Sequence, residues 1–261
     1  MQAVKEMIFM MNYIAGAVLG KLEKNLYAHF NTAVIAAGGI GTRMRSDVPK
    51  QFIEIGGLPV IVRTVSVFQQ CDFINEIIVV CGKNELQTVK ALVKRYSLDK
   101  VRKIVSGGST RQISVCNGIM NISGDSEFVA IHDAARCLID EDTIRSVFKD
   151  AYKYGAATAA SKVKDTVKIS DGDGFIALTP DRETVWSVQT PQIFKKEIII
   201  SAHELAKREG FESTDDNALV ERAGFRVRLT DCGYGNIKLT TPEDIAIAEA
   251  LLRSKTEVNG K

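Results

Sequence analysis

The chain lacks most of the residues on which common metal and acid–base sites depend. It contains three scattered histidines, and its five cysteines form no C-x-x-C pair. This excludes a structural zinc cluster or a disulfide framework and favours a reducing, cytoplasmic setting. The formal net charge is only +2, so neither a nucleic-acid coat nor a polybasic membrane patch is indicated. Any basic site must therefore be local.

Long apolar runs are also missing. The N-terminal stretch MIFMMNYIAGAVLG is shorter than the roughly 20 residues that a membrane-spanning helix needs. We therefore expect no stable membrane insertion. Residues 1–30 are interpreted as an N-terminal extension of unknown role, with a signal peptide or an early start codon as the alternatives. Residues 31–255 are expected to form one domain.

From residue 31 onward, short apolar runs of strand length alternate with segments of helical spacing. Such alternation predicts right-handed βαβ units, and hence a Rossmann-like, doubly wound α/β fold with a mainly parallel sheet. Strands are expected at 32–37, 76–82, 101–107, 127–133 and 156–163, and helices at 59–71, 84–97, 109–121 and 141–155. Ligands of such sheets bind beyond the carboxyl ends of the strands.

Residues 164–187 break this alternation. They contain β-type runs on both sides of Asp171-Gly172-Asp173-Gly174, a strong hairpin signal. We predict a β-arm that projects from the α/β body.

The first predicted strand runs into the glycine-rich loop AAGGIGTRM. No Gly-Lys-Ser/Thr comes after it, which excludes a P-loop, and a third glycine is missing for the dinucleotide fingerprint. The segment carries cations instead, namely Arg43 and Lys50. Backbone N–H groups at glycines approach phosphates closely, and these two cations could neutralise a triphosphate. The loop therefore favours attack at an α-phosphorus with pyrophosphate leaving.

Such a nucleotidyl transfer does not depend on the missing histidines. A phosphate monoester nucleophile is already anionic at neutral pH and needs no general base. Catalysis would rest on positioning and on electrostatic stabilisation by cations.

Seven motifs, in order, carry a family resemblance: AAGGIGTRM…PKQF, GGSTRQISV, HDAAR, KDTVK, WSVQTPQIF, STDDNALVE and GNIKLTTPED. Together they resemble the 2-C-methyl-D-erythritol 4-phosphate cytidylyltransferases and their relatives, the ribitol-5-phosphate cytidylyltransferases. The resemblance runs from about Thr32 to Leu252. It implies transfer of CMP from CTP to a polyol phosphate.

The resemblance also implies a set of site residues. The cations Arg43, Lys50 and Lys238 would hold phosphates, with Arg43 and Lys50 stabilising the transition state. Nucleotide contacts would come from Ala36, Ala37, Gly38, Gly108, Ser109 and Ser114, the last three reading the cytosine edge. Substrate contacts would come from Asp133, Arg136, Thr166 and Thr214, with Arg182 as a further catalytic cation.

The resemblance further implies a homodimer in which the arm carries Thr166 and Arg182 into the partner's active site. The expected metal is Mg²⁺, held mainly by nucleotide phosphates, with Asp133 as a weak candidate ligand. Asp215 and Asp216 are interpreted as a helix N-terminal pair rather than metal ligands.

Alternatives remain at this point. The GGIG loop resembles the ribitol branch, and Cys137 replaces a proline that both branches carry, whereas DTVK, VWSVQTPQIF and TDDNALVE resemble the methylerythritol branch. Ribitol 5-phosphate therefore stays open as the acceptor. A catalytically silent nucleotide-binding paralogue is a more distant alternative.

Overall fold

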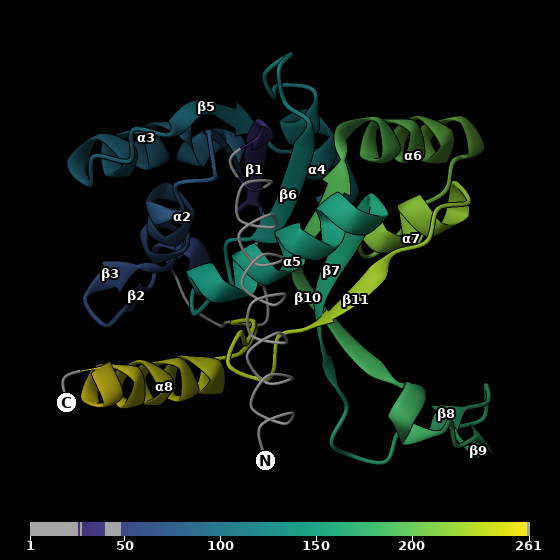
Figure 1. Ribbon diagram of the computed structural model, residues 1–261. Helices are drawn as coiled ribbons and strands as arrows, with labels where there is room; N and C mark the ends of the chain where they lie inside the picture. Colours follow the sequence, from purple (N-terminus) through teal and green to yellow (C-terminus); the bar gives the residue numbers. More distant parts are fainter. Residues whose placement is uncertain (1–25, 27, 40–47, 260–261) are drawn as a thin grey trace, which may run out of the picture.

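A computed structural model describes residues 26, 28–39 and 48–259 of the chain (Figure 1). Most of the N-terminal extension and the loop 40–47, including Arg43, lie outside the described residues. Among the helices that are described, none is long and apolar enough to cross a membrane.

The central element is a seven-stranded sheet, and its mainly parallel character confirms the expected α/β fold. In sheet order its strands are β11 (Arg228–Asp231), β7 (Ala156–Lys162), β10 (Trp186–Lys195), β6 (Phe128–Asp133), β1 (Asn31–Ala36), β4 (Glu76–Cys81) and β5 (Val101–Ser106). Strand β10 runs antiparallel to both of its neighbours. It was not among the predicted strands, and its reversal follows from the chain's return out of the arm.

The inner strands are buried on both faces, as parallel strands covered by helices usually are. Every residue of β4 and of β6 is buried. In the register of the sheet, Ala36 at the end of β1 lies beside Val80 of β4 and Asp133 of β6. The carboxyl ends of β1, β4 and β6 therefore meet at one edge of the sheet.

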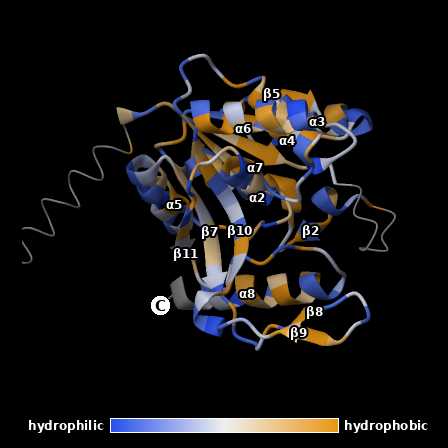
Figure 2. Cartoon of the chain, turned by 90° about the vertical axis from the view of Figure 1, so that its right-hand side faces the viewer, coloured by the Kyte–Doolittle hydropathy of each residue, from blue (hydrophilic) through white to orange (hydrophobic). Residues whose placement is uncertain are grey.

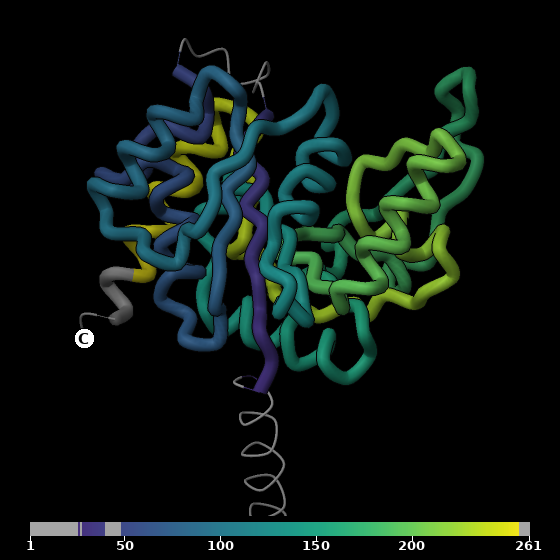
Figure 3. The backbone as a smooth tube through the Cα atoms, turned by 90° about the horizontal axis from the view of Figure 1, so that it is seen from above, coloured from purple at the N-terminus to yellow at the C-terminus, as the bar shows by residue number. Residues whose placement is uncertain are grey.

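Helices cover both faces of the sheet. One apolar cluster joins the sheet to α2, α3 and α5, and another joins it to α4, α6 and α7. The bounds of these helices are α2 (Val60–Gln70), α3 (Leu86–Arg95), α4 (Arg111–Ile119), α5 (Glu141–Tyr154), α6 (Lys196–Glu209) and α7 (Asp216–Arg222). In Figure 3, β1 runs through the middle of the molecule, with α6 and α7 to its right.

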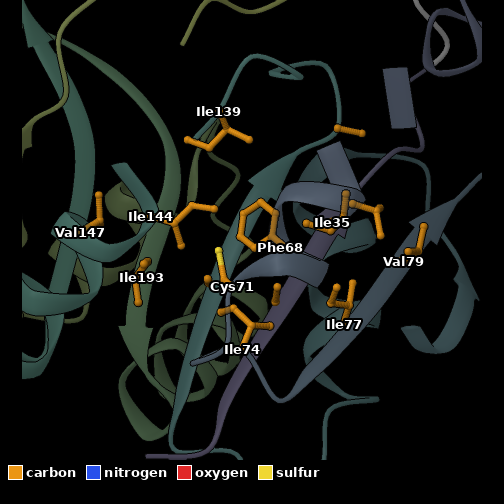
Figure 4. Close-up of a cluster of buried hydrophobic side chains, with 14 of the residues drawn as sticks. Ile35, Phe68, Cys71, Ile74, Ile77, Val79, Ile139, Ile144, Val147 and Ile193 are labelled. Atoms are coloured by element: carbon orange, nitrogen blue, oxygen red, sulfur yellow. The ribbon is translucent and has the colours of Figure 1, made fainter. Parts of the chain in front are cut away.

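Alternation along β1 divides its side chains between the two cores. Ile35 packs in the first cluster and Val34 in the second. Figure 4 shows the first cluster, where Ile35 and Val79 from the strands lie near Phe68 of α2, and Ile144 lies on α5. Burying each such side chain contributes about 1.5–3 kcal/mol.

Local signals set the ends of α5. The carboxylate of Asp140 accepts a hydrogen bond from the backbone N–H of Thr143 at 3.0 Å and caps the helix. Gly155 ends the helix in the left-handed conformation, with φ 84°. The C-terminal helix α8 (Glu243–Asn259) contacts strand β2 of the small β2–β3 hairpin (Glu54–Ile55 and Leu58–Pro59).

The predicted arm is present as an excursion between β7 and β10 (Figure 1). It contains the hairpin β8 (Ile169–Ser170) and β9 (Ile176–Leu178), followed by the short helix η4 (Arg182–Thr184). Its turn is closed by Asp171, whose carboxylate accepts from the backbone N–H groups of Asp173 and Phe175.

Candidate active site

A cavity of about 840 Å³ opens at the carboxyl ends of β1, β4, β5 and β6, the edge at which parallel sheets bind ligands. Its volume suits a small organic ligand. Nine predicted site residues line it: Ala36, Ala37, Gly38, Lys50, Gly108, Ser109, Ser114, Asp133 and Lys238. Residues that lie far apart in the sequence thus share one cavity.

Four other predicted residues do not line this cavity. Thr166 and Arg182 lie exposed on the arm, and Thr214 is exposed just before α7. Arg136 follows β6, but its guanidinium donates to the carbonyl oxygen of Asn236 at 2.8 Å. Within a single chain, the arm residues are therefore placed apart from the cavity that they are predicted to serve.

The loop between β5 and α4 forms the uncharged part of the cavity. A Cβ atom on Gly107 would lie 2.8 Å from Ser114 Oγ, and one on Gly108 would lie 2.2 Å from Ile113 Cγ2. Both positions therefore require glycine. Ser114 Oγ donates to the carbonyl oxygen of Thr110 at 2.8 Å and accepts from the N–H of Gly108 at 3.0 Å. With its proton engaged, this hydroxyl can act toward a ligand only as an acceptor.

Lys50 begins the short helix η2 (Lys50–Phe52), which crosses the β1 side of the cavity. A Cβ atom on Gly39 would lie 3.6 Å from Lys50 Nζ. The ammonium group thus lies over the loop that follows β1. A phosphate group at that loop would meet backbone N–H groups and this cation together.

Asp133 stands at the end of β6 between two cations. Its Oδ2 accepts from Lys238 Nζ at 2.5 Å, and its Oδ1 accepts from Arg111 Nε at 3.0 Å. Burial raises the pKa of this carboxyl, but the two cations outweigh burial and hold the pKa well below its usual range. Asp133 is therefore ionised at neutral pH and fixes the positions of both cations.

Arg111 continues this network behind the cavity. Its Nη1 donates to Asp216 Oδ2 at 2.7 Å, and Asp216 Oδ1 lies 3.2 Å from His203 Nε2. Burial disfavours the charged guanidinium, but Asp216 and Asp133 raise the pKa of Arg111 above its ordinary value. One arginine thus joins the strand carboxylate to a carboxylate on α7.

The interpretation of Asp215 and Asp216 as a helix N-terminal pair is confirmed. Asp215 caps α7, with Oδ1 accepting from the N–H of Ala218 at 3.2 Å, and Asp216 lies in the first turn of the helix. Asp216 is also fully buried and ion-paired with Arg111, a contact that was not predicted. Its partner lies more than a hundred residues earlier in the chain, so no local pattern indicated the pair.

The histidine on β6 is buried and is not among the residues that line the cavity. His132 lies between the hydroxyl of Thr190 and the carbonyl oxygen of Arg136. Burial lowers its pKa to about 3, so the imidazole stays neutral at physiological pH.

His203 behaves in the opposite way, which makes stability depend on pH. Burial lowers its pKa, but hydrogen bonds to Asp216 and Cys116 raise it from the ordinary 6.5 to about 9. Because the pKa of His203 is higher in the folded protein than in the unfolded chain, protonation of His203 stabilises the fold. This contribution is complete below pH 6.5 and is lost as the pH rises through 9. We expect the free energy of unfolding to fall by up to about 3 kcal/mol over this window.

Denaturant titrations at pH 6.5 and pH 9 measure this loss. The His203→Gln variant, which carries no titrating ring, should show a smaller decline than the wild type. An equal decline in both proteins would contradict the assignment. Because His203 lowers the pKa of the Cys116 thiol, Cys116→Ser serves as a control for thiol ionisation.

A cluster of protein ligands for a metal is not found in the part of the chain that the structure describes. The carboxylate among the cavity-lining residues is that of Asp133, and both of its oxygens already accept from cations. This donor set fits a divalent cation held mainly by ligand phosphates, with Asp133 as a neighbouring carboxylate.

Known proteins are similar to this chain in sequence and fold. The family model of IspD, 2-C-methyl-D-erythritol 4-phosphate cytidylyltransferase, matches residues 31–254. The chain belongs to this family. A 2-C-methyl-D-erythritol 4-phosphate cytidylyltransferase of Caldanaerobacter subterraneus is 46% identical over 223 residues, which cover 85% of this chain and 98% of that protein. Its counterpart from Clostridium novyi is 45% identical, over 86% and 97%.

Solved structures of the family have the same fold. The 4-diphosphocytidyl-2C-methyl-D-erythritol synthase of Anaerococcus prevotii matches with a TM-score of 0.77 at 34% identity, over 86% of this chain and 99% of that one. The cytidylyltransferase of Thermus thermophilus matches with a TM-score of 0.70 at 29% identity, over 84% and 98%. Members of this family are CTP-dependent cytidylyltransferases of isoprenoid precursor synthesis.

Several cavity-associated residues were not predicted from the sequence. Arg111 lies inside the GGSTRQISV motif. Its position shortly after a glycine pair, at the start of a helix, is the feature from which it could have been predicted. Gln51 follows Lys50 directly in PKQF. The bonds from Arg111 to Asp216 and from Gln51 to Glu85 gave no local signal, because they join segments that lie far apart in the sequence.

Proposed function

We propose that this protein transfers CMP from CTP to 2-C-methyl-D-erythritol 4-phosphate, giving 4-diphosphocytidyl-2-C-methyl-D-erythritol and pyrophosphate. The observation that carries the proposal is the convergence of Lys50, Lys238 and Arg111 on one cavity in a chain of this family. The relatives named above are methylerythritol enzymes, which favours this acceptor over ribitol 5-phosphate.

The reaction makes and breaks one bond at phosphorus. An oxygen of the substrate phosphate attacks the α-phosphorus of CTP, and the bond from that phosphorus to the α–β bridging oxygen breaks. Pyrophosphate leaves with the bonding electrons. Negative charge grows on the phosphorus centre and the leaving group, so fixed cations stabilise the transition state more than the ground state.

The cavity residues divide this work. Lys50, above the loop after β1, is placed for the triphosphate. Lys238, held by Asp133, is placed for the substrate side near β6. Asp133 would lie beside a magnesium ion held mainly by the phosphates of the ligand, and this ion would supply further neutralisation of charge.

The loop between β5 and α4 is suited to binding the cytosine base. The Ser114 hydroxyl, available only as an acceptor, matches the donor character of the cytosine 4-amino group. Uracil presents a carbonyl oxygen at the same place. A mismatched polar edge leaves buried groups unpaired and is rejected strongly.

Pyrophosphate release from CTP with Mg²⁺ tests the proposal directly. We expect methylerythritol phosphate to be used at least about 100-fold more efficiently than D-ribitol 5-phosphate. Preference for ribitol phosphate would reassign the acceptor. Failure to release pyrophosphate with either acceptor would favour the silent paralogue, and omission of the metal in the same assay tests the need for Mg²⁺.

The arm suits a role between subunits. Its side chains Phe175, Ile176 and Leu178 are 73%, 65% and 55% exposed, and β9 carries apolar colour at the edge of the molecule (Figure 2). Such an apolar patch on a projecting element favours association with another copy. We therefore expect a homodimer in which Thr166 and Arg182 act on the partner's cavity. We expect the protein to be located in the cytoplasm.

A mixed dimer tests arm exchange. Arg182→Ala and Lys50→Ala homodimers should each lose activity, because each site lacks one cation. A heterodimer of the two has one complete site, the cavity with Lys50 served by the arm with Arg182. We expect the purified heterodimer to regain about half of the wild-type activity, measured by pyrophosphate release. A heterodimer as inactive as its parents would exclude action in trans.

A further inference from the structure

Gln51 has an unusual position among the cavity-lining residues. It is only 2% exposed, yet it borders the cavity immediately after Lys50. Its Nε2 donates to Glu85 Oε1 at 2.6 Å. Its Oε1 is buried, and no partner for it is found among the residues that the structure describes.

Glu85 determines which way this amide faces. An ionised carboxylate accepts hydrogen bonds and donates none, so Gln51 must present its nitrogen to Glu85. The other carboxylate oxygen, Oε2, accepts from the N–H of Gly82 at 2.8 Å. The amide oxygen of Gln51 is therefore held away from Glu85, and a buried carbonyl left without a donor destabilises the protein.

The location of Gln51 and Glu85 indicates which group of a bound nucleotide would donate to Gln51 Oε1. Gly82 follows β4, which lies between β1 and β5 in the sheet. On the β1 side lie Gly39 and the Lys50 ammonium, and on the β5 side lies the uncharged loop of Gly108 and Ser114. If the phosphates of a nucleotide lie on the β1 side and its base lies on the β5 side, its ribose lies between these two sides. The ribose carries hydroxyl donors.

We propose that Gln51 Oε1 accepts a hydrogen bond from a ribose hydroxyl of the bound nucleotide and that Glu85 is the residue that positions Gln51 for this contact. This inference rests on the proposed use of CTP. It assigns ribose selectivity to the residue next to Lys50. It also gives the buried carbonyl a partner in the complex.

Deoxynucleotides test the contact. Activity with CTP, 2′-deoxyCTP and 3′-deoxyCTP is compared by kcat/KM, and affinity for the same three nucleotides is compared by calorimetry. The wild type should prefer CTP over one of the two analogues by at least about tenfold, which corresponds to about 1.4 kcal/mol. Gln51→Met keeps the side-chain length without the acceptor, and its preference should fall below about threefold.

Two further variants distinguish the positioning of Gln51 by Glu85 from general damage to the protein. Glu85→Gln offers one acceptor where the carboxylate offers two, so its preference should lie between those of the wild type and Gln51→Met. Gln87→Met, an exposed glutamine on α3, should keep the full preference. Because each preference is a ratio within one variant, partial loss of folded protein does not change it.

The possible failures can be told apart. If Gln51→Met weakens all three nucleotides equally, or keeps the wild-type ratio, the contact is excluded. If Gln51→Met instead loses the preference for CTP over UTP, Gln51 contacts the base and the ribose assignment is wrong. Binding of CTP without pyrophosphate release would refute the proposed function while the affinity ratio still decides the role of Gln51. A wild type that binds no CTP would overturn both proposals.

Discussion

Replacing Lys50 by alanine is expected to lower kcat by about 100-fold to 1,000-fold while leaving the fold intact. The ammonium group lies over the loop after β1, where charge develops on the transferring phosphorus and on pyrophosphate. Fixed charge in a cavity is worth more than the same charge in water. Alanine removes the charge without removing a core side chain, since Lys50 is only half-buried.

Steady-state kinetics and thermal melting measure the two parts of this expectation. Lys50→Arg, which keeps the charge in a longer side chain, should retain more activity than Lys50→Ala. Lys90→Ala removes an exposed lysine on α3 and should behave as the wild type. Activity of Lys50→Ala within tenfold of the wild type would refute the proposed role.

Replacing Arg111 by methionine should lower both stability and activity. The change leaves the fully buried Asp216 with His203 alone and removes one of the two cations from Asp133. Removing one partner of a buried ion pair costs about 3–5 kcal/mol, since an uncompensated charge remains. We expect a loss of that size in denaturant unfolding, together with a lower kcat because Asp133 and Lys238 are no longer held.

A second substitution distinguishes a lost ion pair from poor packing. In Arg111→Met/Asp216→Asn the unpaired carboxylate is gone, so much of the lost stability should return. Activity should stay low, because the cavity still lacks its guanidinium. Arg102→Met, at an exposed position of β5, is the matched control. A double variant no more stable than Arg111→Met alone would contradict the ion-pair explanation.

Local patterns were sufficient for much of the fold. The alternation of apolar runs with helical spacing predicted β1, β4, β5, β6 and β7 and the helices between them, and all are present. The turn Asp171-Gly172-Asp173-Gly174 predicted the arm hairpin. These signals operate within a few residues, so the sequence contains them directly.

The antiparallel strand β10 shows where such patterns stop. Its residues belong to WSVQTPQIF, which was noted as a motif rather than as a strand of the sheet. Its place between β6 and β7 depends on pairing with residues 24 to 67 positions earlier in the chain. Long-range pairing of this kind is not encoded in a local period.

The candidate site divides in the same way. By itself, the sequence determined that glycines, Arg43 and Lys50 follow the first strand, and it therefore indicated phosphate chemistry, whereas Asp133 and Lys238 were indicated by the family resemblance. Only the tertiary structure decided how their charges are balanced. Arg111 bridges β6 and α7, and Glu85 orients Gln51 from a segment 34 residues away in the sequence. The reason is physical: a buried ion pair or amide has a function only through partners that folding brings within about 3 Å, and sequence spacing carries no record of them.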